Sequence, residues 1–215
     1  MMRYMLCCVI ITSILVLFIG PLSAAEIHDA VERGDKEAVK VLLESNPELI
    51  NAQDVYGWTP LHMAAAKGNV ELVKLFLARG AKINAQANNG HTPLSKAAWN
   101  GHKKVVSILV SNNCHVNTKS VNGCTPLHGA AYGGYLEIAR LLVAEGSEVN
   151  TAAKDGQTPL IMAVARGNSN IVVFLLDKGA DINIKAKNGK TALAVAREKK
   201  YDRIAELLKK RGAHE

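Results

Sequence analysis

The stretch Gly123-Cys124-Thr125-Pro126-Leu127-His128 decides the fold, because the chain repeats it at a fixed interval. A second full copy occupies residues 57–62, and shorter copies open at three further glycines. Successive copies are 33 residues apart, a spacing typical of stacked supersecondary units. The opening glycines are Gly57, Gly90, Gly123, Gly156 and Gly189.

Each copy also carries the start signal of a helix. Thr125 is a good N-cap, Pro126 suits the first helical position, and Leu127 then points into a core. A glycine separates the first helix from a second, and another ends the second helix in the left-handed conformation. Asn113 stands at one such end, and Lys200 stands where the last copy should have its separating glycine.

Apolar residues recur in the same columns of every copy, which predicts one continuous core shared by stacked helix pairs. A pair this small cannot bury its apolar stripe alone. The columns are Leu61, Leu94, Leu127, Leu160 and Leu193; Ala64, Ala97, Ala130, Ala163 and Ala196; Leu75, Ile108, Leu141, Phe174 and Leu207; and Phe76, Leu109, Leu142, Leu175 and Leu208.

The sequence therefore predicts an all-α solenoid of helix-turn-helix units joined by β-hairpin-like loops. In the first unit we expect helices over residues 27–33 and 36–44. Polar outer faces at both ends suit terminal, capping units. The units are a capping repeat at 26–53, full repeats at 54–86, 87–119, 120–152 and 153–185, and a C-terminal capping repeat at 186–215.

Residues 59–64 and 125–130 both read Thr-Pro-Leu-His-x-Ala, and with the 33-residue period they make the chain resemble the ankyrin-repeat family. The resemblance covers residues 26–215. It implies a non-enzymatic module that binds proteins through its loop tips and the concave side of its first helices. It also implies that His62 and His128 are structural, each bonded near its own threonine.

Charge is distributed unevenly along a chain whose net charge is +7. Residues 26–53 carry three basic and seven acidic side chains, whereas residues 186–215 carry nine basic and four acidic ones. This asymmetry concerns partners and solubility rather than fold. It favours an acidic protein partner at the basic end, and the acidic N-terminal unit argues against nucleic acid.

The first 25 residues have the three parts of a secretory signal peptide. Arg3 precedes an apolar run at residues 5–19, and small residues end at Ala25, the expected cleavage site. The alternative is an uncleaved anchor, although a helix of that length is about 22 Å and shorter than a bilayer core of about 30 Å. The signal predicts export, to a bacterial periplasm or outside the cell.

The sequence offers candidates for chemistry, none of them convincing. Cys124 and His128 have a nucleophile–base spacing, but no orienting acid accompanies them. Cys7 and Cys8 fall in the apolar run, so Cys114 and Cys124 remain, and we expect free thiols. His28, Asp29 and Glu32 share one helical turn, which we interpret as a solvated acidic face rather than a metal site. We expect no enzyme activity, metal or cofactor.

The loop-tip and helix-end positions do not repeat, which is what a binding surface predicts. Both tryptophans of the chain lie in such positions, and Trp and Tyr are enriched at binding hot spots. We therefore predict a monomeric, exported scaffold that holds a protein partner, with a membrane-tethered scaffold as the alternative. The predicted partner-binding residues are Tyr56, Trp58, Lys67, Asn89, His91, Trp99, Asn100, Tyr132, Asp155, Arg166, Lys187 and Lys190.

Overall fold

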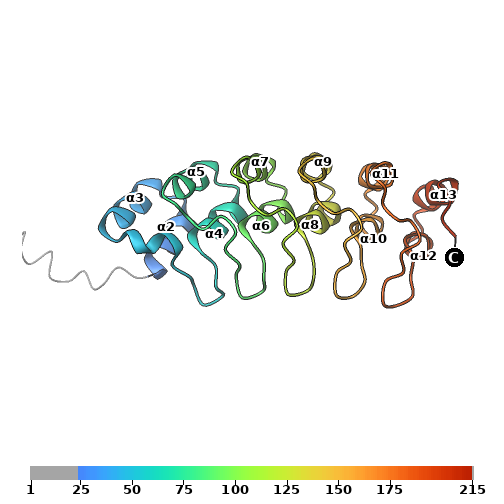
Figure 1. Ribbon diagram of the computed structural model, residues 1–215, viewed down its shortest axis with the longest axis horizontal. Coiled ribbons are helices and arrows are strands. Elements are labelled where there is room, and N and C mark those ends of the chain that lie inside the picture. The colour runs from blue at the N-terminus through green and yellow to red at the C-terminus, as the bar shows by residue number, and fades with distance from the viewer. Residues whose placement is uncertain (1–23, 215) are drawn as a thin grey trace, which may run out of the picture.

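The computed structural model describes residues 24–214, which form an all-α solenoid of six stacked helix pairs without a strand among them (Figure 1). The second helices run along one edge, the first helices lie beside them, and the loops project from the opposite edge. The pairs are α2 (Ala24–Arg33) with α3 (Lys36–Ser45), α4 (Pro60–Lys67) with α5 (Val70–Ala78), α6 (Pro93–Trp99) with α7 (Lys103–Ser111), α8 (Pro126–Gly133) with α9 (Leu136–Ala144), α10 (Pro159–Ala165) with α11 (Ser169–Asp177), and α12 (Ala192–Glu198) with α13 (Asp202–Lys210).

The predicted signal peptide lies almost entirely outside the described residues. Only Ala24 and Ala25 of it are described, and both belong to the first turn of α2. In residues 24–214, no helix combines the length and the apolar character that crossing a bilayer requires. A short 3₁₀ helix, η1 (Pro47–Asn51), follows α3 and leads into the first repeated loop.

The predicted helix starts are confirmed, since a threonine is the N-cap of every first helix from α4 to α12. At α6 the cap is reciprocal. The Ser95 amide donates to the Thr92 hydroxyl at 3.2 Å, and the Thr92 amide donates to the Ser95 hydroxyl at 2.8 Å. His62 plays the part of Ser95 at α4. Orphan amides at the helix start are thereby satisfied in both directions.

The predicted left-handed helix ends are also confirmed, including the one at Asn113, and Lys200, which stands in place of a separating glycine, adopts the same conformation. Asn113 has φ 58° and Lys200 has φ 57°. Lysine is unfavourable in this conformation by about 1–2 kcal/mol, whereas glycine is not. At the equivalent Gly167 a Cβ would lie 3.2 Å from the Tyr201 ring of the next repeat. Within residues 24–214, no ring of a further repeat covers Lys200.

Three of the four predicted core columns are confirmed and the other needs correction. The columns that begin at Leu61, Ala64 and Phe76 are buried throughout. In the column that begins at Leu75, only Phe174 is buried, with the Arg140 guanidinium 5.2 Å from its ring centre. The other members are half-buried and pack on the rim of the core. A column we did not predict is buried instead: Leu72, Val105, Ile138, Ile171 and Ile204.

Main-chain hydrogen bonds join each loop tip to the next, in an arrangement we call the loop ladder. The Asn88 amide donates to the Tyr56 carbonyl at 3.0 Å, and the later tips repeat this bond. Close approach explains one glycine of the repeated phrase, because a Cβ at Gly90 would lie 2.7 Å from the Val121 nitrogen. The remaining bonds run from Val121 to Asn89, from Lys154 to Asn122 and from Lys187 to Asp155.

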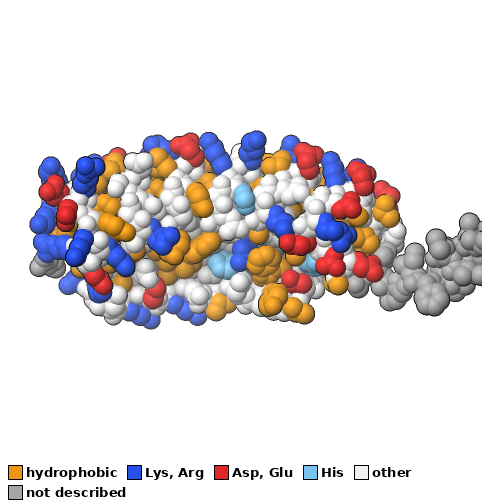
Figure 2. All heavy atoms as spheres, turned by 180° about the vertical axis from the view of Figure 1, so that it is seen from behind, with side chains coloured by type: hydrophobic (Ala, Val, Ile, Leu, Met, Phe, Trp, Pro, Cys, Tyr) orange, Lys and Arg blue, Asp and Glu red, His pale blue; other side chains and the backbone are white. Residues whose placement is uncertain are grey.

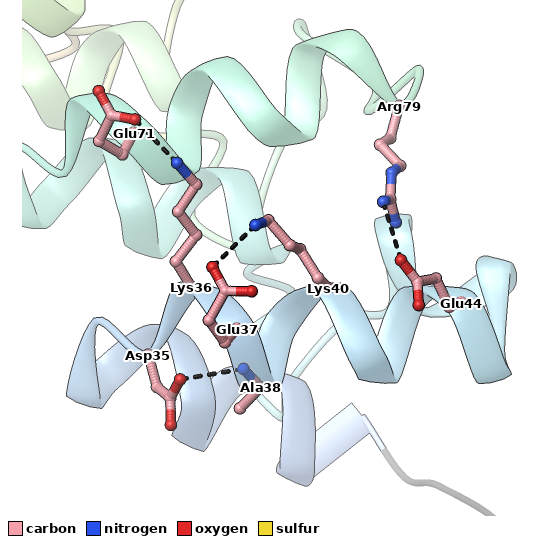
Figure 3. A network of polar contacts seen from close by, with 8 residues as sticks. All are labelled: Asp35, Lys36, Glu37, Ala38, Lys40, Glu44, Glu71 and Arg79. Carbon is pink, nitrogen blue, oxygen red and sulfur yellow. Dashed lines mark hydrogen bonds and ion pairs between the residues drawn. The ribbon is translucent and has the colours of Figure 1, made fainter.

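Ion pairs on the surface connect the acidic first repeat to the second repeat. The Lys36 ammonium lies 2.9 Å from Glu71, and the Arg79 guanidinium lies 3.6 Å from Glu44. Figure 3 shows these side chains together with Asp35, which caps α3. Lys36 lowers the pKa of the Glu71 carboxyl. Exposed pairs contribute about 0–1 kcal/mol each, so apolar contacts provide most of the attachment of this repeat.

Candidate partner-binding surface

Four side chains from successive repeats form a continuous row of ring contacts, which we call the aromatic row: His91, Trp99, Tyr132 and Arg166. Trp99 and Tyr132 are stacked, with ring centres 5.4 Å apart and planes 21° apart. His91 meets the other side of Trp99 edge-on at 6.4 Å, and the Arg166 guanidinium lies 4.6 Å from the Tyr132 ring centre. Trp99 and Tyr132 come from the last turns of α6 and α8, and Arg166 is the C-cap of α10.

Trp99 has its place in the row because the residue of α8 beneath its indole, Gly129, has no side chain. A Cβ at Gly129 would lie 2.7 Å from Cε3 of Trp99, so the indole covers the helix backbone itself. Trp99 is consequently half-buried, whereas 38% of Tyr132 is exposed. Sequence reasoning missed Gly129. Its column does not repeat, however: Met63, Lys96, Gly129, Met162 and Val195.

Lys96, from the same variable column, is the second residue that sequence reasoning missed. Its ammonium lies 4.4 Å from the Trp58 ring centre, on the side of the surface nearest the N-terminus. Burial lowers the pKa of Lys96. It also lowers the pKa of the half-buried His91, and the nearby Lys96 charge adds to that effect. We call Trp58 and Lys96 the tryptophan–lysine pair.

Neither cation of this surface, Lys96 or Arg166, forms an ion pair with a carboxylate of the described residues. Each cation contacts an aromatic face instead, an interaction worth roughly 0.5–1 kcal/mol at exposed sites. The aromatic rings can bind apolar groups of a partner, and the unpaired cations beside them can bind its acidic groups.

The structure brings together five of the twelve predicted site residues: Trp58, His91, Trp99, Tyr132 and Arg166. The other seven lie elsewhere or have intramolecular bonds. Tyr56 is 69% exposed at a loop tip, and Asn100 donates to the Ala66 carbonyl at 2.7 Å. Lys67 pairs with Glu32 at 2.6 Å, and Lys190 pairs with Glu198 at 2.6 Å. The remaining three, Asn89, Asp155 and Lys187, belong to the loop ladder.

The histidines of the repeated phrase are structural, as expected. Nδ1 of His62 accepts from the Thr59 amide at 3.1 Å, and Nε2 is 3.0 Å from the His91 carbonyl oxygen of the next repeat, which accepts from the ring N–H. His128 makes the same contacts to Thr125 and to the Gln157 carbonyl. Burial lowers the pKa of both imidazoles to about 4, so they are neutral at pH 7.

The expectation that His28 belongs to a solvated acidic face is wrong. His28 is 5% exposed, and its Nε2 lies 2.8 Å from the Trp58 carbonyl oxygen. It thus forms the first of the contacts between histidine and the next repeat. In the part of the chain that the structure describes, no three His, Cys, Asp or Glu side chains are grouped as metal ligands.

The two cysteines of the described chain are free thiols. Cys114 is buried and Cys124 is half-buried. Burial raises the pKa of Cys114 to about 11, and burial together with the Asp155 charge raises the pKa of Cys124. A nucleophilic cysteine needs a lowered pKa, and Cys124 has the opposite. The raised pKa favours the protonated thiol over the thiolate at neutral pH.

Figure 2 shows how charges are distributed over one face of the molecule. Lys and Arg side chains gather at the end of the last repeat, on the left, and Asp and Glu side chains at the end of the first repeat, on the right. Hydrophobic side chains lie between the two ends. The face thus has the polarity that the sequence indicates, with an apolar centre.

Comparison with known families gives a match over the whole described chain. A family model described as "Ankyrin repeats (3 copies)" matches residues 27–120, 80–153, 108–186 and 127–215. The overlapping matches together cover residues 27–215.

Curated relatives match short parts of the chain. The 2-5A-dependent ribonuclease of Mus musculus is 44% identical over 52 residues, 24% of this chain and 7% of the relative. Ankyrin repeat, SAM and basic leucine zipper domain-containing protein 1 of Oryctolagus cuniculus is 44% identical over 66 residues, 29% of this chain and 14% of the relative. Protein phosphatase 1 regulatory subunit 27 of Homo sapiens is 36% identical over 63 residues, 29% of this chain and 40% of the relative. The matches thus span less than half of each relative.

Proposed function

The chain belongs to the ankyrin-repeat family, whose repeats mediate protein–protein interactions and are generally not enzymatic, and on this basis we propose that it is a non-enzymatic scaffold that binds a protein partner on the aromatic row and the neighbouring loop tips. The observation that carries the proposal is the row itself. It crosses repeat boundaries through ring contacts, yet it occupies positions that the repeat does not fix.

The row has the composition of an interface hot spot, with Trp, Tyr and Arg side by side. Tyr132 is its most accessible ring, and Arg166 supplies a positive charge that forms no ion pair within residues 24–214. The loop tips continue the surface with exposed Tyr56 and Val55. An acidic partner would be attracted to the Arg166 end and repelled by the first repeat, which fixes the direction in which it binds.

The test is a site-specific photo-crosslink, followed by substitution of the same residue. A crosslinker at position 132 should capture a discrete protein in the native compartment. The matched control is a crosslinker at Val41, which is 61% exposed on α3 and far from the row along the chain. Tyr132→Ala should weaken binding of the captured protein about tenfold, whereas Val41→Ala should leave it unchanged. Equal capture from both positions, or full affinity of Tyr132→Ala, would contradict the proposal.

We further propose that the protein acts outside the cytoplasm as a monomer. The signal-like residues 1–25 support export, and the alternative is that residues 5–19 remain as an N-terminal anchor. Mass spectrometry of the native protein distinguishes the two. A mature chain that begins at Glu26 supports export with cleavage, and a retained N-terminus in the membrane fraction supports the anchor.

A further inference from the structure

A basic groove lies beside the aromatic row, between the last two repeats. Its volume is about 480 Å³, and it lies between the turn that joins α10 to α11 and the turn that joins α12 to α13. Three cationic side chains line it, Arg166, Lys200 and Arg203, with the single carboxylate of Asp202. All four are exposed, so an ion in solution can reach them.

The groove retains a positive charge because its cations are not matched. Within residues 24–214, the ion pairs include none of Arg166, Lys200 and Arg203. The helices that begin at the groove, α11 and α13, also lack a side-chain cap. The positive ends of their dipoles therefore add to the attraction for an anion.

Lys200 is an independent sign that charge at this place matters. It adopts the left-handed conformation that the corresponding positions of repeats two to five occupy with glycine. Glycine there would relieve the unfavourable backbone conformation. Strained residues cluster at sites where the side chain has a task. At Lys200 the chain adopts this strained conformation with a lysine, whose side chain lines the groove.

Arg166 connects the groove with the aromatic row. Its guanidinium lies 4.6 Å from the Tyr132 ring centre, and the same side chain lines the groove. Tyr132 in turn stacks on Trp99 at 5.4 Å. Apolar rings and unmatched cations thus follow each other along one surface, in the order Trp99, Tyr132, Arg166 and then the groove.

We propose that the groove binds the carboxylates of an acidic segment in the protein partner, while an apolar side chain of the same segment rests on Tyr132 and Trp99. This inference rests on the proposed function, since it names the partner chemistry of the same surface. Guanidinium groups bind carboxylates through paired N–H donors, and the ammonium of Lys200 adds a point charge. The partner segment should therefore carry an aromatic or aliphatic residue followed by Asp or Glu residues.

A nucleic acid fits the observations less well. A phosphate backbone needs cations along a track, and its binding energy rises with the number of phosphates neutralised. Here the three cations of the groove share it with Asp202, and the first repeat, at the far end of the molecule, is acidic. A short acidic peptide needs one concentrated site, which the groove supplies.

The test uses the full chain and a blocked peptide, Phe-Glu-Glu-Glu, whose binding is followed by NMR amide shifts. The probing variant is Lys200→Glu with Arg203→Glu. The matched control is Lys74→Glu with Lys104→Glu, in a groove of about 470 Å³ between other repeats, which makes the same change in net charge. Thermal melts establish that both variants fold. The probing variant should bind the peptide at least about fivefold more weakly, and the control less than about twofold more weakly.

The proposal is overturned if peptide addition leaves the groove amides unshifted, if both variants weaken binding equally, or if oligo-dT binds the chain more tightly than the peptide does. Its failure can be separated from failure of the proposed function. A captured partner that Tyr132→Ala releases but Lys200→Glu with Arg203→Glu retains would refute the groove alone. If Tyr132→Ala left the affinity for the captured partner unchanged, the proposed function would be refuted. The peptide titration would still test the groove.

Discussion

His62 and His128 show at the scale of single residues how a neutral buried base connects two repeats. Each accepts a hydrogen bond from its own N-cap amide and lies within hydrogen-bond distance of a carbonyl in the next repeat. Both are 0% exposed, and desolvation lowers each pKa from 6.5 to about 4. At acidic pH these two histidines lower the free energy of unfolding, because the unfolded chain then binds protons that the folded chain cannot bind.

We expect the free energy of unfolding to fall between pH 6.5 and pH 4 because of these two side chains. Above that window the imidazoles are neutral in both states, within it only the unfolded state binds protons, and below it the loss levels off. By pH 5 the loss should be about 2 kcal/mol per histidine. Urea unfolding at pH 7 and pH 5 measures it.

The control for this prediction comes from the chain itself, since Ser95 forms the same reciprocal cap at α6. His62→Ser with His128→Ser should be less stable at pH 7, because the carbonyls of the next repeats lose a donor. It should lose much less further stability at pH 5 than the parent. Glu71 and Glu198 have lowered pKa values and remain ionised there. An unchanged pH dependence in the variant would contradict the assignment.

Lys200 supplies a second prediction at this scale. Because its φ of 57° suits glycine, Lys200→Gly should raise the free energy of unfolding by about 0.5–1 kcal/mol, after the greater freedom of glycine in the unfolded chain is counted. The neighbouring Lys199 has φ −82°, so Lys199→Gly should lower it instead. Thermal melts of the two variants, which remove the same charge, measure the difference. If Lys200→Gly destabilised the protein as Lys199→Gly does, the backbone of Lys200 would not be strained.

At the scale of helices, Trp99 and Gly129 join α6 and α8 in a way that the repeat pattern does not encode. In isolation Gly129→Ala would favour a helix by about 1 kcal/mol. Here the new methyl would lie 2.7 Å from the indole, and displacing a packed ring costs about 1–3 kcal/mol. We expect the clash to dominate, so that Gly129→Ala lowers stability and changes tryptophan fluorescence.

A double-mutant cycle checks the cause. In the Trp99→Ala background the 2.7 Å contact with the ring is gone, while main-chain atoms of residue 99 remain 3.1 and 3.2 Å from the new methyl, so Gly129→Ala should lower stability much less than in the parent. The same loss of stability in both backgrounds would show that the methyl meets something other than the indole.

Helix positions were predictable from the sequence because each start has its own local chemistry. Thr125 and its equivalents cap a helix whatever surrounds them, and the glycines that follow end it. The column of Leu75 was not predictable in the same way. Half-burial depends on how the next repeat covers a helix, and periodicity does not contain that information.

The site was predictable in part for a related reason. Variable positions identified Trp99, Tyr132 and Arg166, but nothing local indicated that they touch across repeats. Lys96 and Gly129 were missed because a lysine and a glycine on a helix have common structural explanations. Only the stacking of repeats places Lys96 over the Trp58 ring and Gly129 beneath the Trp99 ring.

For the molecule as a whole, the uneven charge should govern how fast a partner binds. The first repeat is acidic and the last is basic, so an acidic partner is steered toward one end. We expect the association rate of the captured partner to fall about tenfold or more between low salt and about 0.5 M salt, with a smaller change in the dissociation rate. Stopped-flow mixing measures both rates. Faster association at high salt would mean that steering by the basic end is absent.

The loop ladder has a consequence for the entropy of binding. Each tip is bonded through its main chain to the tips beside it, so the exposed side chains of Tyr56 and its neighbours project from a backbone that is already ordered. A loop that must be immobilised on contact weakens an interface by the freedom it loses. In this molecule the tips have lost that freedom on folding, and nearly all of the ordering that accompanies recognition falls on the partner.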